Sequence, residues 1–217
     1  PLAAGSHADA TQYAVDHNKL VVTLKDGTQT TLAHEAQFVG YNGEVAAPTE
    51  IVFKNNGLHV IIQIDATSPI GKTDAAGVKD LVLEAAVTTI QDLEDSIAAV
   101  DAEEKVEGYR NWLGLMRGTL EESIEKNGKT VTRSLNKDRT YHNLAGSETS
   151  IHGRSLMLLR NVGHLMTNPA ILVDGAEIYE GIMDALITPL LAFADIKGQN
   201  EIKNSRKGSM YIVKPKM

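Results

Sequence analysis

One stretch decides the fold of this chain: Ala85-Ala86-Val87-Thr88-Thr89-Ile90-Gln91-Asp92-Leu93-Glu94-Asp95-Ser96. Its first half is a run of small, apolar and β-branched residues, which is typical of a strand buried on both faces. Its second half is a cluster of acids that ends in a serine. The sequence therefore predicts a buried strand with a polar tip.

An amphipathic helix is predicted directly after this strand. Asp101 can cap its first turn, and Glu104 can reach back to complete a capping box. Four apolar residues then recur at three- and four-residue spacing and predict a face that packs on a sheet: Val106, Tyr109, Leu113 and Met116. The strand, its polar tip and the helix form a β/α unit, and functional residues of such units are commonly found at the carboxyl end of the strand.

Composition indicates a globular protein with a real core. The chain has 217 residues, of which 42% are hydrophobic, and a formal charge of −7 that argues against general nucleic-acid binding. No apolar run approaches the roughly 18 to 20 residues that span a bilayer, so we expect no membrane association. The chain has no cysteine, which excludes disulfides and thiolate metal sites and favours the cytoplasm.

The first third of the chain is predicted to be β-rich. Asp26-Gly27 lies between two strand-like runs, and Asn55-Asn56-Gly57 lies between two more, so each is expected to be the turn of a hairpin. Farther along, Glu121 to Lys126 is expected to be helical. Thr130 to Leu135 alternates like a strand.

Two more buried strands are predicted, at residues 155–161 and 211–213, with a helix at 180–194 between them. The buried stripe expected for that helix is Ile182, Leu186, Leu190 and Phe193, and Pro189 is expected to kink it. Three buried strands joined by β/α crossovers predict a parallel, barrel-like arrangement.

Arg160 is the first candidate site residue. It follows four apolar residues at the end of a predicted buried strand, where a guanidinium requires an anionic partner. Glu94 or Asp95 could supply that anion structurally, or a substrate could. A second candidate for binding anions is the segment with the densest positive charge, although from the residues alone a solvated basic face is the favoured interpretation: Lys126, Lys129, Arg133, Lys137 and Arg139.

Runs along nearly the whole chain resemble malate synthase of the large, monomeric G type. The matching runs are 36–41, 54–59, 65–74, 93–96, 109–116, 152–155, 160–166 and 211–217. The resemblance implies a transferase of the glyoxylate cycle (glyoxylate bypass), linked to the tricarboxylic acid cycle. It condenses glyoxylate with acetyl-CoA and water to give malate and CoA, depends on Mg²⁺, and is a monomer in the cytoplasm.

The fold implied by the resemblance is α/β: part of a TIM (β/α)8 barrel with an inserted, β-rich α/β domain. Residues 1–84 and 118–154 would form the inserted domain. Residues 85–117 would form one β/α unit of the barrel, and residues 155–217 further strands and a helix, truncated at the end.

The resemblance also implies roles for individual residues. Arg160 would be catalytic, binding glyoxylate and stabilising negative charge on its aldehyde oxygen. Ser96 and Arg133 would contact acetyl-CoA. Glu94 and Asp95 would support the strand tip.

The magnesium ligands and the catalytic base of the family are expected beyond Met217, so the chain is expected to be an internal fragment that is inactive alone. Two alternatives stay open from the residues. One is a related barrel lyase that cleaves acyl-CoA esters and would not carry the inserted domain. The other is a non-catalytic binding module in which Arg160 only bridges Glu94 or Asp95.

Overall fold

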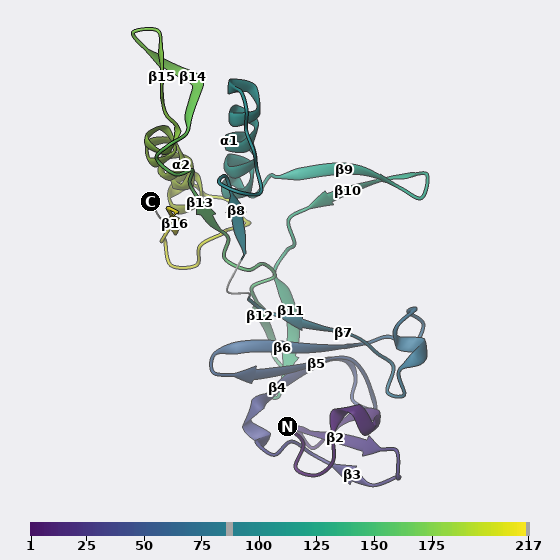
Figure 1. Cartoon of the computed structure of the whole chain (residues 1–217). Helices are drawn as coiled ribbons and strands as arrows, with labels where there is room; N and C mark the ends of the chain where they lie inside the picture. Colours follow the sequence, from purple (N-terminus) through teal and green to yellow (C-terminus); the bar gives the residue numbers. More distant parts are fainter. Residues whose placement is uncertain (86–88, 216–217) are drawn as a thin grey trace. The chain divides into compact units, whose positions relative to one another are not determined.

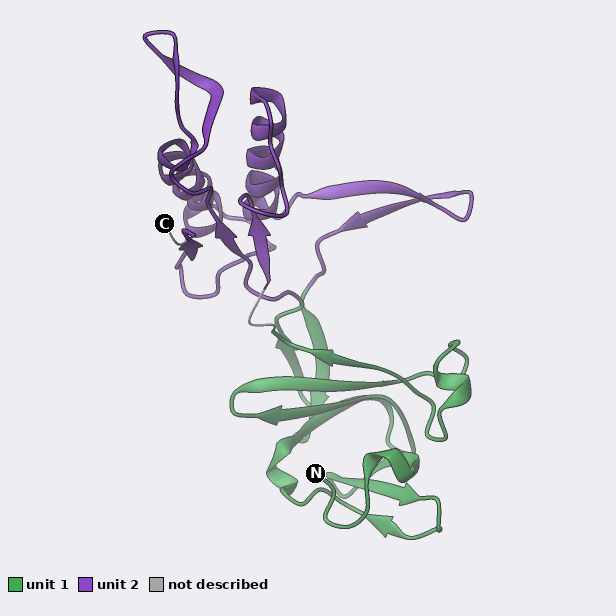
Figure 2. Ribbon diagram, in the orientation of Figure 1, with its two compact units in different colours: residues 1–85, 138–153 green, residues 86–137, 154–217 purple. Residues whose placement is uncertain are grey.

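The computed structural model describes residues 1–85 and 89–215 and divides into two compact units (Figures 1 and 2). Unit 1 contains residues 1–85 and 138–153, and unit 2 contains residues 86–137 and 154–217. Over the part of the chain that is described, no helix is both long and apolar enough to cross a membrane.

Unit 1 is built from antiparallel strands. Its larger sheet has the order β12-β11-β4-β5-β6-β7, and its smaller sheet has the order β1-β2-β3. The strands are β1 Ala10–Asp16, β2 Lys19–Leu24, β3 Gln29–Thr30, β4 Phe38–Glu44, β5 Ala47–Asn55, β6 Leu58–Ile64, β7 Val78–Leu83, β11 Arg139–Asn143 and β12 Glu148–Ile151. Short 3₁₀ helices cover His7–Asp9, Glu35–Gln37 and Gly71–Thr73.

Both predicted hairpins of unit 1 are confirmed. Strands β2 and β3 pair on either side of the Asp26-Gly27 turn, and β5 pairs with β6 across Asn56-Gly57. Asn56 and Gly57 have φ values of 50° and 82°, the left-handed conformation that such a turn requires. The apolar faces of the strands then meet in a core that includes Val22 and Ile51.

Unit 2 contains a parallel sheet of order β16-β13-β8 and two helices that pack on one another (Figure 1). Its elements are β8 Ile90–Asp92, α1 Ala102–Arg117, β9 Glu121–Lys126, β10 Lys129–Ser134, β13 Leu158–Arg160, β14 Thr167–Val173, β15 Ala176–Tyr179, α2 Glu180–Lys197 and β16 Ile212–Val213. Both helices share one hydrophobic core with the central strand β13, through residues such as Trp112, Leu159 and Met183.

The parallel direction predicted for the three strands is confirmed. The strands are shorter than predicted, and the first begins only at Ile90, which is 40% exposed. Residues 86–88 of the predicted strand lie outside the described residues. Three strands do not form a barrel by themselves, so the closed TIM barrel stays a prediction.

Helix α1 begins at the predicted N-cap, Asp101, although Glu104 reaches back to the amide of Val100 instead of that of Asp101. The Asp101 carboxylate accepts a hydrogen bond of 2.9 Å from the Glu104 amide, and the Glu104 carboxylate accepts one of 2.9 Å from the Val100 amide. The predicted packing face was partly wrong, because Val106 is exposed. The buried face of α1 is rotated about the helix axis relative to the predicted one. It includes a lysine, which a pattern of apolar residues does not reveal: Lys105, Tyr109, Trp112 and Met116.

The predicted buried stripe of α2 was wrong. Ile182, Leu186, Leu190 and Phe193 are all exposed, whereas the polar Glu180, Asp184, Thr188 and Asp195 are buried. The polar face of α2 turns inward because α1 and the end of β13 present buried hydrogen-bonding groups to it. Pro189 does lie inside the helix, as predicted.

Residues 121–126 were predicted to be helical, and this was wrong. They form β9, which pairs antiparallel with β10. Asn127 and Gly128 have φ values of 53° and 71° and form the two-residue loop of a β-hairpin. The hairpin pairing outweighs the helix propensity of the glutamates in residues 121–126. The β9–β10 hairpin belongs to unit 2, whereas residues 138–153 belong to unit 1. The resemblance had placed residues 118–154 together in the inserted domain, and that assignment stays a prediction.

Candidate active site

Arg160 and Asp92 end neighbouring parallel strands. The register of β13 and β8 pairs their Cα positions directly, so both side chains leave the sheet on the same side. Arg160 donates from Nε to Oδ1 of Asp92 at 2.8 Å and from Nη2 to Oδ2 at 2.6 Å. This is a bidentate pair, the strongest arrangement between these two groups.

An acidic partner was predicted for Arg160, but Asp92 was not among the predicted partners. Of the two acids named there, Asp95 contacts Nη2 of Arg160, whereas the Glu94 carboxylate accepts a hydrogen bond of 2.6 Å from the Gly163 amide. Asp92 is the last residue of β8, as Arg160 is of β13, but the position alone does not predict that the two pair. In the register of β8 and β13, this residue lies directly beside Arg160.

Asp92 also organises the turn that follows it. Its Oδ1 accepts hydrogen bonds from the amides of Glu94 at 3.0 Å and Asp95 at 3.2 Å. The hydroxyl of Ser96 lies 3.5 Å from Oδ2 of Asp92, at the limit of a hydrogen bond, and Ser96 is exposed. Asp92, Asp95, Ser96 and Arg160 are thus together at the carboxyl edge of the sheet.

These contacts shift the ionisation of both partners. Hydrogen bonds from Arg160, and then from the two backbone amides, lower the pKa of Asp92 to about 2. The same carboxylate, with Asp95, raises the pKa of Arg160. Asp92 is therefore an anion and Arg160 a cation at every physiological pH.

Part of the Arg160 guanidinium is left for a ligand. Its side chain is 30% exposed, whereas that of Asp92 is 13% exposed. Nε and Nη2 are occupied by carboxylates, but Nη1 makes no hydrogen bond or ion pair with any residue in the described ranges. The two N–H donors of Nη1 are thus not used by any of the described residues.

Arg133 is not part of this cluster. It is exposed on β10, opposite Glu122 in the hairpin register, and within the described residues it makes no contact with Arg160 or Ser96. Nor do residues 1–85 and 89–215 contain a group of three or more His, Asp or Glu side chains that could hold a metal ion. Asp92 and Asp95 do not fit a magnesium site, since both are paired with Arg160.

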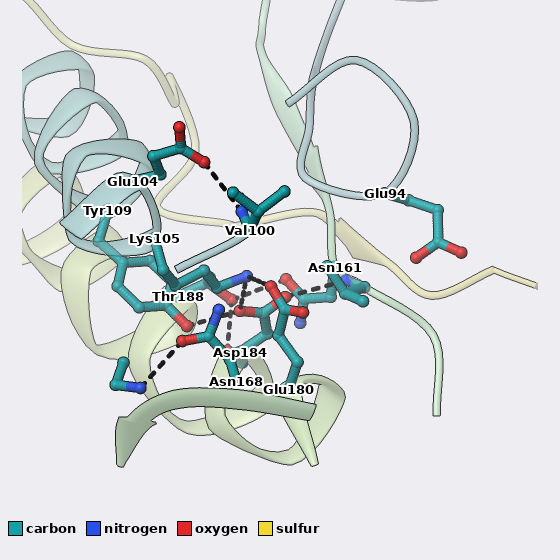
Figure 3. A network of polar contacts seen from close by, with 12 residues as sticks. Glu94, Val100, Glu104, Lys105, Tyr109, Asn161, Asn168, Glu180, Asp184 and Thr188 are labelled. Carbon is teal, nitrogen blue, oxygen red and sulfur yellow. Dashed lines mark hydrogen bonds and ion pairs between the residues drawn. The ribbon is translucent and has the colours of Figure 1, made fainter. Parts of the chain in front are cut away.

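A buried polar network lies between α1 and α2 (Figure 3). Lys105, which is 1% exposed, contacts Glu180 at 2.6 Å and Asp184 at 2.7 Å. The Tyr109 hydroxyl donates to Oδ1 of Asp184 at 2.5 Å, and the Lys105 ammonium lies 5.2 Å from the centre of the Tyr109 ring. Burial and the Asp184 carboxylate raise the pKa of Tyr109.

Two family models match the chain. The alpha-beta insertion domain of malate synthase G matches residues 1–55, and the TIM barrel domain of malate synthase matches residues 156–217, which include β13 and Arg160. Malate synthase G of Halalkalibacterium halodurans is 56% identical over 218 residues, covering 100% of this chain and 30% of the relative. The chain belongs to the malate synthase G family.

Two further relatives agree with this assignment. Malate synthase G of Corynebacterium efficiens is 55% identical and that of Corynebacterium glutamicum 52% identical, each over 216 residues. Each match covers 100% of this chain and 29% of the relative. The chain therefore spans about three tenths of the length of these malate synthase G proteins, and both unit 1 and unit 2 lie inside the aligned region.

Proposed function

We propose that this chain supplies the glyoxylate-binding side of a malate synthase, which condenses glyoxylate with acetyl-CoA and water to give malate and CoA. The observation that carries the proposal is the state of Arg160. It is a permanent cation at the carboxyl end of a parallel strand, fixed by Asp92 and with Nη1 free of contacts among the described residues.

Arg160 would act on glyoxylate in two ways. Its Nη1 hydrogens would bind and orient an oxygen of the substrate, and its charge would stabilise negative charge on the aldehyde oxygen as the acetyl-CoA carbon attacks. A donor that is already oriented needs no rearrangement during the reaction, which makes this kind of stabilisation large. Asp92 would keep the guanidinium oriented and charged.

The remaining assignments belong to the same proposal. Ser96, beside Asp92, would contact acetyl-CoA, and Arg133 would contact its nucleotide part from the β9–β10 hairpin. Glu94 and Asp95 would hold the strand tip. Magnesium would be bound by residues outside those described here, and we place the enzyme in the cytoplasm as a monomer.

The insertion-domain match at residues 1–55 supports this proposal over an acyl-CoA lyase, which would not carry that domain. A purely structural bridge is the second candidate, because Arg160 does pair with Asp92 and Asp95. Arg160→Lys separates the two. Lysine keeps the charge but loses the fork that binds both oxygens of Asp92.

The test measures CoA release by a full-length malate synthase G that carries this sequence. If Arg160 is catalytic, Arg160→Lys lowers kcat about 10²-fold, the usual effect of removing one such donor, while the thermal midpoint stays within a few degrees of wild type. A large fall in the thermal midpoint would favour the bridge instead. Arg110→Lys, at an exposed position of α1, is the control and should change neither quantity. The 217-residue chain by itself is expected to release no CoA.

A further inference from the structure

The backbone that follows Arg160 is held from several sides within three residues. The amide of Asn161 donates to the Val213 carbonyl at 2.9 Å, and the Asn161 side chain accepts from the Thr188 hydroxyl at 3.0 Å. The amide of Val162 donates to Oδ2 of Asp184 at 2.9 Å. The amide of Gly163 is bound by Glu94, as described above. Two of these groups, Thr188 and Asp184, come from α2.

The Asp184 carboxylate is itself fixed from the other side. Its Oδ1 is bound by the Tyr109 hydroxyl and by Lys105, both on α1, so Oδ2 is left to point at the Val162 amide (Figure 3). Asp184 is fully buried, so this arrangement is shielded from water. Buried hydrogen bonds and ion pairs of this kind restrict the positions of the groups that they join.

The first turn of α2 also packs directly on the same backbone. A Cβ atom added to Gly181 would lie 2.8 Å from the Val162 carbonyl oxygen and 3.0 Å from that of Gly163. Only a residue without a side chain allows the helix to come this close. Gly181 therefore sets the distance between α2 and the backbone that follows Arg160. Asp184 sets the orientation of that backbone through its bond to the Val162 amide.

From these contacts we propose that α2 positions Arg160, with Asp184 and Gly181 as the positioning residues. Neither touches the Arg160 side chain. They fix residues 161–163, and so the end of β13 from which the guanidinium reaches Asp92. The proposal rests on the proposed role of Arg160 in binding glyoxylate, and it adds residues of α1 and α2 to the site.

The experiment uses the 217-residue chain and two variants that act in different ways. Asp184→Asn weakens the charged contact to the Val162 amide. Gly181→Ala pushes α2 away from the tip but gains helix propensity, which offsets part of the stability cost. Leu186→Ala, at an exposed position of the same helix, is the matched control.

Three quantities are measured by NMR: hydrogen exchange of the Val162 amide, the resonance of the Arg160 Nε–H, and the Kd for glyoxylate. In both variants the Val162 amide exchanges faster, the Nε–H resonance shifts, and Kd rises about tenfold, as expected for a misplaced charged donor. Leu186→Ala leaves all three unchanged. The Nε–H resonance is the specific readout, because a general loss of stability does not move it while the chain is folded.

The positioning role and the proposed function fail separately. If wild type binds glyoxylate and Gly181→Ala shows an unchanged Nε–H resonance and Kd, the positioning role is refuted. If wild type shows no response to glyoxylate, the function proposed for this chain fails. In that case the inference is judged by the Nε–H resonance alone: a shift in Gly181→Ala and Asp184→Asn supports it, and no shift refutes it.

Discussion

Replacing Lys105 by methionine is expected to destabilise unit 2 strongly. Methionine has nearly the same length and helix propensity as lysine, so packing and helix formation change little. The charge is lost, however, and two carboxylates that are 4% and 0% exposed, those of Glu180 and Asp184, are left without their cation. Breaking a buried ion pair from one side costs about 3 to 5 kcal/mol.

This loss can be measured for unit 2 alone. The chain has one tryptophan, Trp112, which lies buried on α1 and donates a hydrogen bond of 3.1 Å to the Thr188 carbonyl. Its fluorescence therefore reports the unfolding of unit 2. With a urea slope of about 2 kcal/mol per M, the Lys105→Met midpoint should fall by about 1.5 to 2.5 M.

Arg110→Met is the matched control for this prediction. Arg110 lies on the same helix and pairs with Glu107 at 3.7 Å, but its side chain is 73% exposed, so the pair contributes less than about 1 kcal/mol. A Lys105→Met loss as small as that of the control would refute the reasoning. It would mean that the buried carboxylates take up protons or water without cost.

The remaining predictions use the same fluorescence signal. Arg160 lowers the pKa of Asp92 to about 2, below its ordinary value of 3.8. The ionised Asp92 therefore stabilises unit 2 above about pH 4, and this contribution disappears as the pH falls from about 4 to 2. Asp92→Asn should be less stable than wild type at pH 7 and should lose less stability than wild type across that window; equal losses would contradict the pairing. Gly118→Ala should cost about 1 to 3 kcal/mol, because Gly118 ends α1 at φ 72° and a Cβ there would lie 2.7 Å from the Ile202 carbonyl oxygen. An unchanged midpoint would show that this helix end adjusts freely.

Local signals in the sequence predicted the local structure well. Asp101 and Glu104 form the expected cap of α1, and Asn56-Gly57 forms the expected turn. In each case the residues that carry the signal also make the decisive hydrogen bond or adopt the decisive φ. Caps and turns of this kind are formed by residues that are close in the sequence, so their formation does not depend on the rest of the fold.

Interactions between distant elements were predicted less well. The apolar residues of α2 suggested a buried stripe, but the side of the helix that faces inward is chosen by the Val162 amide and by Tyr109, more than 20 residues and 75 residues away. Asp92 was missed for a related reason. Its pairing with Arg160 depends on a strand register across 68 residues, which no local pattern encodes.

The β4–β11 pairing has a consequence for synthesis on the ribosome. Asn42 on β4 bonds to the Thr140 carbonyl on β11, 98 residues later. At about 5 to 20 residues per second, β11 emerges roughly 5 to 20 s after β4. During that interval the edge of β4 is an unpaired strand that can bind other chains. Faster translation between the two strands would shorten the interval, and we expect it to raise the yield of folded protein.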